Sequence, residues 1–216
     1  MTISIVIPAY NEAQRIGNVV KAATQYADEI LVIDDGSNDD TAKIATEAGA
    51  LVLHQKHNGY IAAIKRGFRK ARGDILITMD ADGEHNTDDI PRLIAPILSG
   101  DADLVLGARP HIDRLSERLI NWLTNLRVNV KDCGSGFRAI RKNSALSLEL
   151  HGKCTCGVFV LEAASYGLRI VEVPISLKSI FKKRKIIWTH LLQLFYVLRL
   201  LIRFPQRSWQ PAANNH

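Results

Sequence analysis

Residues 75–85 read ILITMDADGEH, an apolar run that is followed at once by a cluster of acidic side chains. A run that is apolar on both faces is typical of a strand buried inside a parallel sheet. Similar runs occur elsewhere in the chain, at Ile3–Ile7, Ile30–Ile33, Ala50–His54 and Leu104–Gly107. The sequence therefore predicts a set of buried strands, of which Ile75–Met79 is one.

Helical patterns lie between these runs. Apolar side chains repeat at helical spacing in two segments, at Ile16, Val19, Val20 and Ala23 and at Ile90, Leu93, Ile94, Ile97 and Leu98. After Pro110 the pattern predicts a helix over Leu115–Val128, a Gly-rich turn at Cys133–Gly136, a short strand, two more helical stretches and a strand over Arg169–Leu177. This alternation predicts an α/β fold in which helices flank a mostly parallel sheet.

The composition supports one globular domain with attachments. The 216 residues are 47% hydrophobic and 23% charged, without a low-complexity tract, which excludes disordered, collagen-like and repeat-array proteins. The net charge of +6 is uneven, because residues 173–216 hold eight Lys and Arg and no acid, and the remainder has a net charge of −2. This distribution argues against nucleic-acid binding by residues 1–172. It predicts instead that the basic C-terminal segment binds an anionic partner.

The three cysteines, Cys133, Cys154 and Cys156, are too few and too clustered for a disulfide framework, which fits a reducing compartment. Cys154 and Cys156 lie near His151, but they lack the C-x2-C spacing of a zinc site and no second pair exists. The sequence therefore predicts no metal centre there. The chain opens as a strand, without a basic region before the apolar stretch, which is unlike a secretory signal.

Polar side chains gather where the predicted strands end. The first strand leads into Pro8–Glu12, the second into Asp34–Ser37 and the fourth into Asp80–His85. Ligands of open parallel sheets bind beyond the carboxyl ends of the strands, so these segments predict the site. The chain has no G-x-G-x-x-G after the first strand and no G-x-x-x-x-G-K-[ST] motif, which excludes the dinucleotide-binding and P-loop classes.

Asp80 and Asp82 place two hard oxygen ligands near one point, as a Mg²⁺ or Mn²⁺ ion with open positions for a substrate diphosphate requires. Glu84 is a third candidate ligand. Such an ion would stabilise the charge that builds on a departing nucleoside diphosphate. The alternative interpretation is a helix cap or a solvated turn, since acids at strand ends often serve in this way.

Asp34 and Asp35 could likewise either bind a ligand or cap a helix. They could cap the helix that starts near Asp40, but residues 37–40 already supply capping side chains. The pair is therefore predicted to bind hydroxyls or a base edge of a nucleotide.

Five segments carry a family resemblance in this order: IPAYNE (7–12), VIDDGSNDDT (32–41), ITMDADGEH (77–85), GAR (107–109) and DCGSGFRAIRK (132–142). Together they resemble the family 2 inverting glycosyltransferases of the GT-A fold, and most closely the branch of dolichol- or polyprenyl-phosphate mannosyl- and glucosyltransferases. The resemblance runs from residue 3 to about residue 177. It implies a metal-dependent inverting hexosyltransferase with a mixed, mostly parallel sheet, a nucleotide-sugar donor (GDP-, UDP- or dTDP-hexose) and a lipid-phosphate acceptor.

The resemblance also implies roles for individual residues. It implies nucleotide-sugar binding for Pro8, Tyr10, Glu12, Asp34, Asp35, Asp80, Ala81 and Arg109. It implies metal binding for Asp80, Asp82 and Glu84, contact with the acceptor phosphate for Arg109, Ser135 and Arg138, and catalytic roles for Asp82 and Arg138. The chain departs from the family in three places: Glu84 stands where Gln is usual, Cys154–Gly157 stands where an acid is usual, and Leu177–Lys185 lacks the usual glycine.

The acceptor class depends on whether the reaction needs a base. A phosphate oxygen is already ionised at neutral pH, and the planar guanidinium of Arg138 could bind it through two parallel hydrogen bonds. A hydroxyl acceptor would instead require a general base, for which His85 and Asp132 are the candidates. A catalytically silent nucleotide-sugar-binding partner of a membrane protein is the alternative from another class. The sequence leaves all three open.

The last part of the chain predicts an amphipathic helix. Residues 186–204 are mostly apolar, with a narrow polar stripe at Thr189, Gln193, Tyr196, Arg199 and Arg203. The apolar stretch before the arginines is shorter than a membrane span. Residues 1–177 are thus predicted to form the GT-A domain, and residues 178–216 a basic tail at the cytoplasmic face of a membrane, with Lys182–Lys185, Trp188 and Trp209 at headgroup level. The alternative is a helix packed on its own domain, on a second copy of the chain or on a membrane-protein partner.

Overall fold

The computed structural model describes residues 1–112, 114–178 and 187–203. Within these residues one seven-stranded sheet has the order β3-β2-β1-β4-β6-β5-β7. Its strands are β1 (Ile3–Ala9), β2 (Glu29–Asp34), β3 (Leu51–His54), β4 (Ile75–Thr78), β5 (Leu104–Ala108), β6 (Arg138–Arg141) and β7 (Ile170–Pro174). Only β6, the predicted short strand, runs antiparallel to its neighbours, β4 and β5. The predicted mixed, mostly parallel sheet is confirmed.

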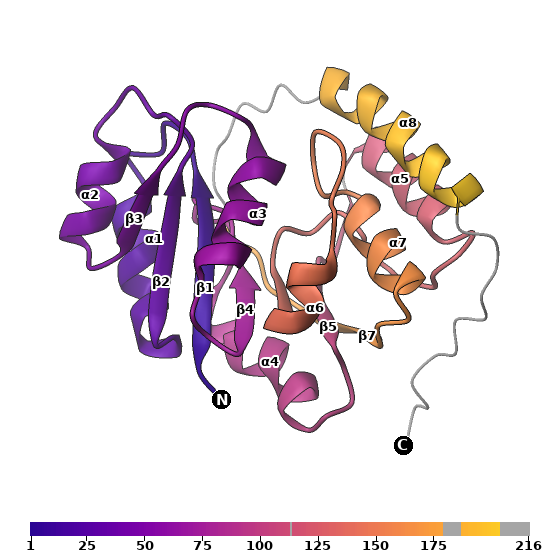
Figure 1. Cartoon of the computed structure of the whole chain (residues 1–216), viewed down its shortest axis with the longest axis horizontal. Helices are drawn as coiled ribbons and strands as arrows, with labels where there is room; N and C mark the ends of the chain where they lie inside the picture. Colours follow the sequence, from indigo (N-terminus) through magenta and orange to yellow (C-terminus); the bar gives the residue numbers. More distant parts are fainter. Residues whose placement is uncertain (113, 179–186, 204–216) are drawn as a thin grey trace.

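Helices cover both faces of the sheet (Figure 1). One face is covered by α1 (Ile16–Ala23), α2 (Thr41–Glu47) and α4 (Ile90–Leu98). The other is covered by α3 (Tyr60–Lys70), α5 (Leu115–Thr124), α6 (Lys142–Ser147), α7 (Val158–Ser165) and α8 (Ile187–Arg203). Two short 3-10 turns, η1 (Thr24–Tyr26) and η2 (Thr87–Asp89), follow α1 and precede α4.

Alternation along β1 divides the core between the two faces. Ile5 and Ile7 pack with α1 and α4, whereas Val6 packs with α3, and all three are fully buried. Helix α3 approaches β1 so closely that a Cβ at Gly67 would lie 2.2 Å from a methyl of Val6. The predicted apolar face of α1 is buried throughout, but Leu98, assigned to the buried face of α4, is half exposed at the helix end. Helix α5 ends at Thr124, before the predicted Val128.

The strand directions bring the functional segments to one edge of the sheet. Parallel pairing places Ala9 beside Asp34, so the loops after β1 and β2 leave together. Antiparallel pairing places Thr78 beside Arg138, so the loop before β6 lies next to the loop after β4. The Gly-rich turn and the D-x-D segment therefore meet, although they are far apart in the sequence.

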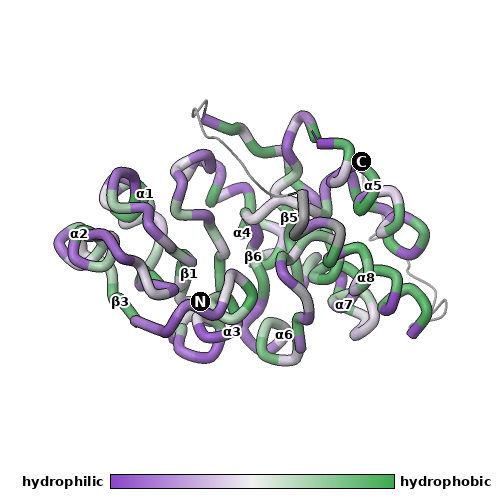
Figure 2. The backbone as a smooth tube through the Cα atoms, turned by 90° about the horizontal axis from the view of Figure 1, so that it is seen from above, coloured by the Kyte–Doolittle hydropathy of each residue, from purple (hydrophilic) through white to green (hydrophobic). Residues whose placement is uncertain are grey.

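Helix α8 lies along α5 and α7 of its own chain (Figure 1). Val197 and Gln193 are fully buried, so Gln193 of the predicted polar stripe points into the protein. The helix is therefore packed on its own domain, which was the alternative to the predicted helix lying in the membrane interface. The outward side still carries exposed apolar residues, and Figure 2 shows α8 as hydrophobic over most of its length. The domain boundary at 177/178 stays a prediction.

No helix among the described residues is long and apolar enough to cross a bilayer. The predicted headgroup contacts of Lys182–Lys185 and Trp209 lie outside the described residues, as does the side chain of Trp188.

Candidate active site

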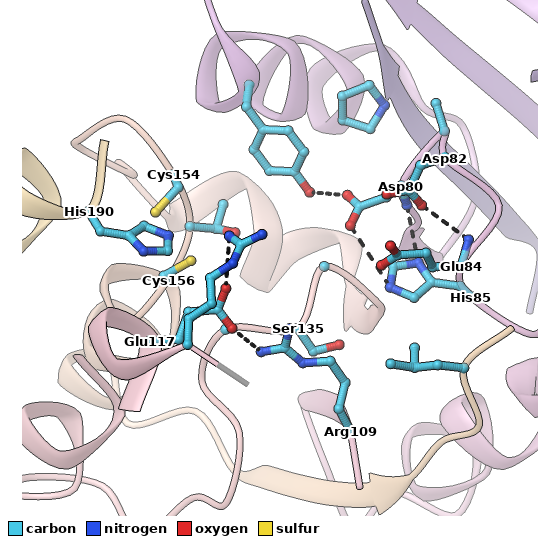
Figure 3. A pocket seen from close by; sticks show the side chains of 18 of the residues that line it. Asp80, Asp82, Glu84, His85, Arg109, Glu117, Ser135, Cys154, Cys156 and His190 are labelled. Carbon is cyan, nitrogen blue, oxygen red and sulfur yellow. Dashed lines mark hydrogen bonds and ion pairs between the residues drawn. The ribbon is translucent and has the colours of Figure 1, made fainter. Parts of the chain in front are cut away.

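A cavity of about 350 Å³ opens at the edge of the sheet where these loops meet (Figure 3). It gathers most of the residues that the sequence predicted for the site: Pro8, Tyr10, Glu12, Asp80, Ala81, Asp82, Glu84, Arg109 and Ser135. They come from the ends of β1, β4 and β5 and from the turn before β6. The cavity thus joins the predicted nucleotide, metal and acceptor segments.

Two hydrogen bonds fix the carboxylates of the D-x-D segment. The Tyr60 hydroxyl donates to Asp80 Oδ1 over 2.9 Å, and the Glu84 backbone N–H donates to Asp82 Oδ1 over 3.1 Å. Gly83, between the acids, has a φ of +80°, a conformation that glycine adopts without strain. The Asp80 side chain keeps 33% of its surface exposed, so it remains accessible from the cavity.

Asp80 and Asp82 fit the hard-cation site that the resemblance implies. A Mg²⁺ or Mn²⁺ ion is commonly held by one or two carboxylates together with substrate phosphates and water, which is the donor set that these residues offer. A Cβ at Gly136 would lie 2.5 Å from Asp80 Oδ2, so the backbone there cradles the carboxylate. Glu84 lines the same cavity, but the three acids do not form a convergent group of ligands among the described residues.

His85 is buried in the cavity wall and stacks on Phe137 at a centroid distance of 4.9 Å. Its Nδ1 accepts the backbone N–H of Asp80 over 3.3 Å. Burial lowers the pKa of His85, and the charges of Asp80 and Asp82 oppose this only in part. A neutral ring that accepts at Nδ1 carries its proton on Nε2.

Arg109 lines the cavity but is held within the protein. Its Nε donates to Asp132 Oδ2 over 2.7 Å, and its Nη2 donates to Asp132 Oδ1 and to Glu117 over 2.9 and 3.0 Å. Burial would lower the pKa of Arg109, but these carboxylates raise it above its ordinary value, so the guanidinium stays charged. The geometry of the guanidinium is fixed by two acids, whose charges offset its own.

The structure places Arg138 in the core, and its predicted role at the acceptor phosphate stays a prediction. Its side chain is 1% exposed and does not line the cavity. The guanidinium lies over the Phe159 ring at 4.7 Å, and Nη1 donates to Thr155 Oγ1 over 2.8 Å. The side chain points into the core because β6 is a central strand and Arg138 faces α7 from it. Arg138 therefore contacts the cavity through Thr155, which it binds and which lines the wall. Arg109 and Ser135 are the acceptor-phosphate candidates that line the cavity themselves.

Asp34 and Asp35 are also buried, and neither lines the cavity, so their predicted contact with the nucleotide stays a prediction. Asp35 accepts the backbone N–H groups of Asn58 and Gly59 over 2.9 Å each, directly before α3 begins. Asp34 accepts the Ser37 N–H over 3.2 Å and contacts the His54 ring over 3.0 Å. Capping of α2 does not require the pair, but Asp35 binds the backbone N–H groups at the start of α3.

Several lining residues were not assigned to the site from the sequence. They are Tyr60, Arg114, Glu117, Gly134, Gly136, Cys154, Thr155, Cys156, Leu177 and His190. Tyr60 and Glu117 lie on helices, where an amphipathic pattern does not distinguish a site residue from a surface residue. His190 reaches the cavity only because α8 packs against α5 and α7. Signals were available for some of the others: Gly134 and Gly136 lie in the predicted Gly-rich turn, and the cysteines and Leu177 lie in segments that depart from the family pattern.

A mostly parallel sheet with helices on both faces, acids after β4 and a cavity at its carboxyl edge defines the class of open α/β proteins that bind a ligand at this edge. Residues 4–158 match the family described as Glycosyl transferase family 2, and the chain belongs to this family. The GT-A fold and the resemblance predicted from the sequence are confirmed, and the chain is a glycosyltransferase by family.

Curated relatives agree with the family, and a solved structure agrees with the fold. UDP-N-acetylglucosamine--dolichyl-phosphate N-acetylglucosaminyltransferase of Methanococcus voltae is 32% identical over 211 residues, covering 80% of this chain and 84% of the relative. Undecaprenyl-phosphate 4-deoxy-4-formamido-L-arabinose transferase of Edwardsiella ictaluri is 32% identical over 193 residues, covering 80% of this chain and 59% of the relative. Glucosyl-3-phosphoglycerate synthase of Mycobacterium tuberculosis, crystallised with Mn²⁺, UDP-glucose and phosphoglyceric acid, superposes with a TM-score of 0.81 at 22% identity, covering 99% of this chain and 88% of that chain.

Proposed function

We propose that this chain transfers a hexose from a nucleoside-diphosphate sugar to a polyprenyl- or dolichyl-phosphate-type lipid, with inversion at the anomeric carbon and with Mg²⁺ or Mn²⁺ as cofactor. Relatives named for undecaprenyl-phosphate and dolichyl-phosphate acceptors support the acceptor class. The Mn²⁺ and UDP-glucose in the superposed synthase crystals support the donor and the cofactor.

One observation carries the acceptor class: both candidate general bases are already engaged. The Asp132 carboxylate binds Arg109 through both oxygens. His85 uses its Nδ1 lone pair to accept the Asp80 N–H, and its other ring nitrogen then carries the proton. A hydroxyl acceptor would need one of these groups as a base, whereas a lipid phosphate arrives ionised and needs only to be positioned.

The carboxylate side of the cavity suits the donor. Asp80 and Asp82 would hold the cation, which supplies charge neutralisation for the departing diphosphate. Tyr60 and the Glu84 N–H keep the two carboxylates in place for this role. The exposed Tyr10 ring packs against His57 with centroids 4.3 Å apart and offers an aromatic surface beside the nucleotide segment.

The opposite wall suits an anionic acceptor. Arg109 and Ser135 line it and would bind the acceptor phosphate. The acceptor oxygen would attack the anomeric carbon from the side opposite the diphosphate, which forms the new glycosidic bond and releases the nucleoside diphosphate in one displacement. A single displacement inverts the configuration and requires no nucleophile from the protein.

The outward sides of α5 and α8 would contact the membrane surface that holds the lipid. Exposed apolar residues follow helical spacing on both: Leu115, Leu119, Trp122 and Leu126 on and after α5, and Leu192, Phe195, Leu198 and Ile202 on α8. The exposed Arg118, Arg199 and Arg203 flank them and suit anionic headgroups. We therefore place the protein peripherally at the cytoplasmic face of a membrane.

Turnover with a defined acceptor tests the proposal. Purified protein is incubated with Mn²⁺ or Mg²⁺ and a panel of GDP-, UDP- and dTDP-hexoses, with and without short-chain polyprenyl phosphate, and release of nucleoside diphosphate is followed. We expect release that requires both the lipid phosphate and the metal and that is lost in Asp82→Asn. The exposed Asp88→Asn is the matched control and should retain activity.

Two outcomes would contradict the proposal. Release with a hydroxyl acceptor such as phosphoglycerate, but not with polyprenyl phosphate, would overturn the acceptor class. Tight donor binding without release under any acceptor would overturn the enzymatic assignment and favour a silent binding module.

A further inference from the structure

Two cysteines and a histidine meet on the cavity wall away from the D-x-D segment (Figure 3). Cys154 and Cys156 lie in the loop before α7, and His190 lies in the first turn of α8. Their ligand atoms all lie within 4.8 Å of one another, and they are the one convergent group of three such residues in the described part of the chain. The sequence predicted no metal centre at the cysteines, and His151, the histidine nearest to them in the sequence, contacts Glu149 instead.

The donor set is soft, in contrast to the oxygens of Asp80 and Asp82. Two thiolates and an imidazole are the ligands that zinc prefers, whereas Mg²⁺ and Mn²⁺ prefer carboxylates and phosphates. Three protein ligands leave one coordination position of a tetrahedral ion for water or another ligand. All three residues line the cavity, so that position would be reached from the cavity.

Neighbouring residues hold the three side chains in place. The Ser116 hydroxyl and His190 Nδ1 form a 2.7 Å hydrogen bond, which orients the ring and leaves Nε2 for an ion. The buried Gln193 accepts the backbone N–H groups of Lys153 and Cys154 over 3.0 and 3.2 Å and donates to the Cys156 carbonyl over 3.1 Å. The cysteine loop and α8 are thus fixed to each other before any ion binds.

The loop that carries the two cysteines is also held by Arg138. Its Nη1 donates to Thr155 Oγ1, on the residue between the two cysteines, over 2.8 Å. The backbone between the two thiols is therefore fixed from inside the protein as well as from α8.

We propose that Cys154, Cys156 and His190 bind one Zn²⁺ ion, with a fourth coordination position open to the cavity. The bound ion would link α8 to the loop before α7. The site is separate from Asp80 and Asp82 and takes a different class of metal. It does not depend on the proposed acceptor, because its test requires no turnover.

The test uses the full chain, reduced with a phosphine that does not bind metal strongly. The protein is stripped with a chelator and titrated with Co²⁺, whose thiolate charge-transfer absorption reports cysteine coordination, and then with Zn²⁺ in competition. We expect one equivalent of Co²⁺ to give this absorption and one equivalent of Zn²⁺ to abolish it. Metal analysis of the Zn²⁺-loaded protein after desalting should give one zinc per chain.

Variants assign the ligands. Cys154→Ser, Cys156→Ser and His190→Gln should each weaken Zn²⁺ binding at least tenfold, and each cysteine variant should reduce the absorption. His151→Gln is the matched control, and Asp82→Asn should keep the thiolate band while losing transfer. Circular dichroism checks that each variant is folded, and His190→Cys, which restores a soft ligand, should retain binding if the glutamine variant unfolds.

Three results would overturn the proposal. They are the absence of a thiolate band in the reduced wild-type protein, Zn²⁺ binding that is unchanged in all three ligand variants, and Zn²⁺ binding that is lost in His151→Gln or Asp82→Asn instead. A wild-type protein that binds zinc but transfers no sugar would count against the proposed function alone.

Discussion

The Tyr60 hydroxyl donates a 2.9 Å hydrogen bond to Asp80 Oδ1 and so ties the start of α3 to the loop after β4. Burial, and then the charge of Asp80, raise the pKa of Tyr60 well above its ordinary value, so the phenol remains a donor. Asp35 fixes the two backbone N–H groups directly before Tyr60. Asp35 is therefore linked to the D-x-D segment through the start of α3.

Tyr60→Phe should lower kcat/KM about 5- to 10-fold, which corresponds to about 1 kcal/mol, the typical net contribution of one hydrogen bond. The ring packing is kept, so the melting temperature should change little. Steady-state kinetics and a thermal melt check this, with Tyr26→Phe as control, because Tyr26 makes a similar bond to Asp88 at the surface. Equal kinetics for both variants would show that Asp80 does not need the phenol.

Gly136→Ala should displace the Asp80 carboxylate. The added Cβ would lie 2.5 Å from Oδ2 and 2.7 Å from Oδ1, closer than non-bonded atoms can approach. We expect Mn²⁺ affinity to fall more than tenfold while the protein remains folded, measured by titration calorimetry and circular dichroism. Unchanged affinity would mean that Asp80 does not bind the ion.

Asp132→Asn should destabilise the fold by about 2–3 kcal/mol near neutral pH, because it leaves the buried Arg109 with only part of its counter-charge. Burial would raise the pKa of Asp132, but hydrogen bonds from Arg109 and its charge lower it overall. A folded pKa below the ordinary value of 3.8 stabilises the protein above that pH, and this stability is lost as the pH falls through the folded pKa.

The difference between wild type and Asp132→Asn should therefore be constant from neutral pH to about pH 5 and shrink below it. Urea unfolding at several pH values measures this difference. A difference that grows on acidification would contradict the sign of the shift.

The sequence predicted what depends on local pattern. The apolar runs identified the strands, because a strand buried on both faces shows no alternation, and the acids after Ile75–Thr78 identified the cavity edge, because parallel strands share their carboxyl end. The predicted strand at Leu104–Gly107 is β5 to within one residue. These features need no knowledge of which segments pack together.

What the sequence did not predict depends on packing between distant segments. Arg138 appeared as a phosphate-binding arginine, but its central antiparallel strand directs it toward Phe159. His190 joined the cysteines only through the docking of α8 on α5 and α7. Gln193 was predicted to lie in the polar stripe of the last helix. It is buried, and its side chain forms hydrogen bonds with backbone groups of the cysteine loop.

Arg138→Lys should act mainly on stability, since lysine cannot both bind Thr155 and lie flat on the Phe159 ring. We expect a loss of about 2 kcal/mol, with the acceptor KM of the folded enzyme changed less than twofold. Urea unfolding and kinetics with short-chain polyprenyl phosphate separate the two effects. A large rise in acceptor KM at unchanged stability would restore the predicted role in phosphate binding.

The double variant Trp122→Ser and Phe195→Ser should lower binding to anionic vesicles at least tenfold. Both side chains are exposed on the outward sides of α5 and α8, and burying an aromatic side chain in the membrane interface contributes about 1.5–3 kcal/mol. Co-sedimentation with phosphatidylserine vesicles measures the loss, and the exposed Leu146→Ser on α6 is the matched control. Activity on a water-soluble short-chain acceptor should be unchanged, because neither residue lines the cavity. Unchanged vesicle binding would contradict membrane contact through this surface, and a fall in molecular mass by light scattering would instead identify it as the interface between two copies of the chain.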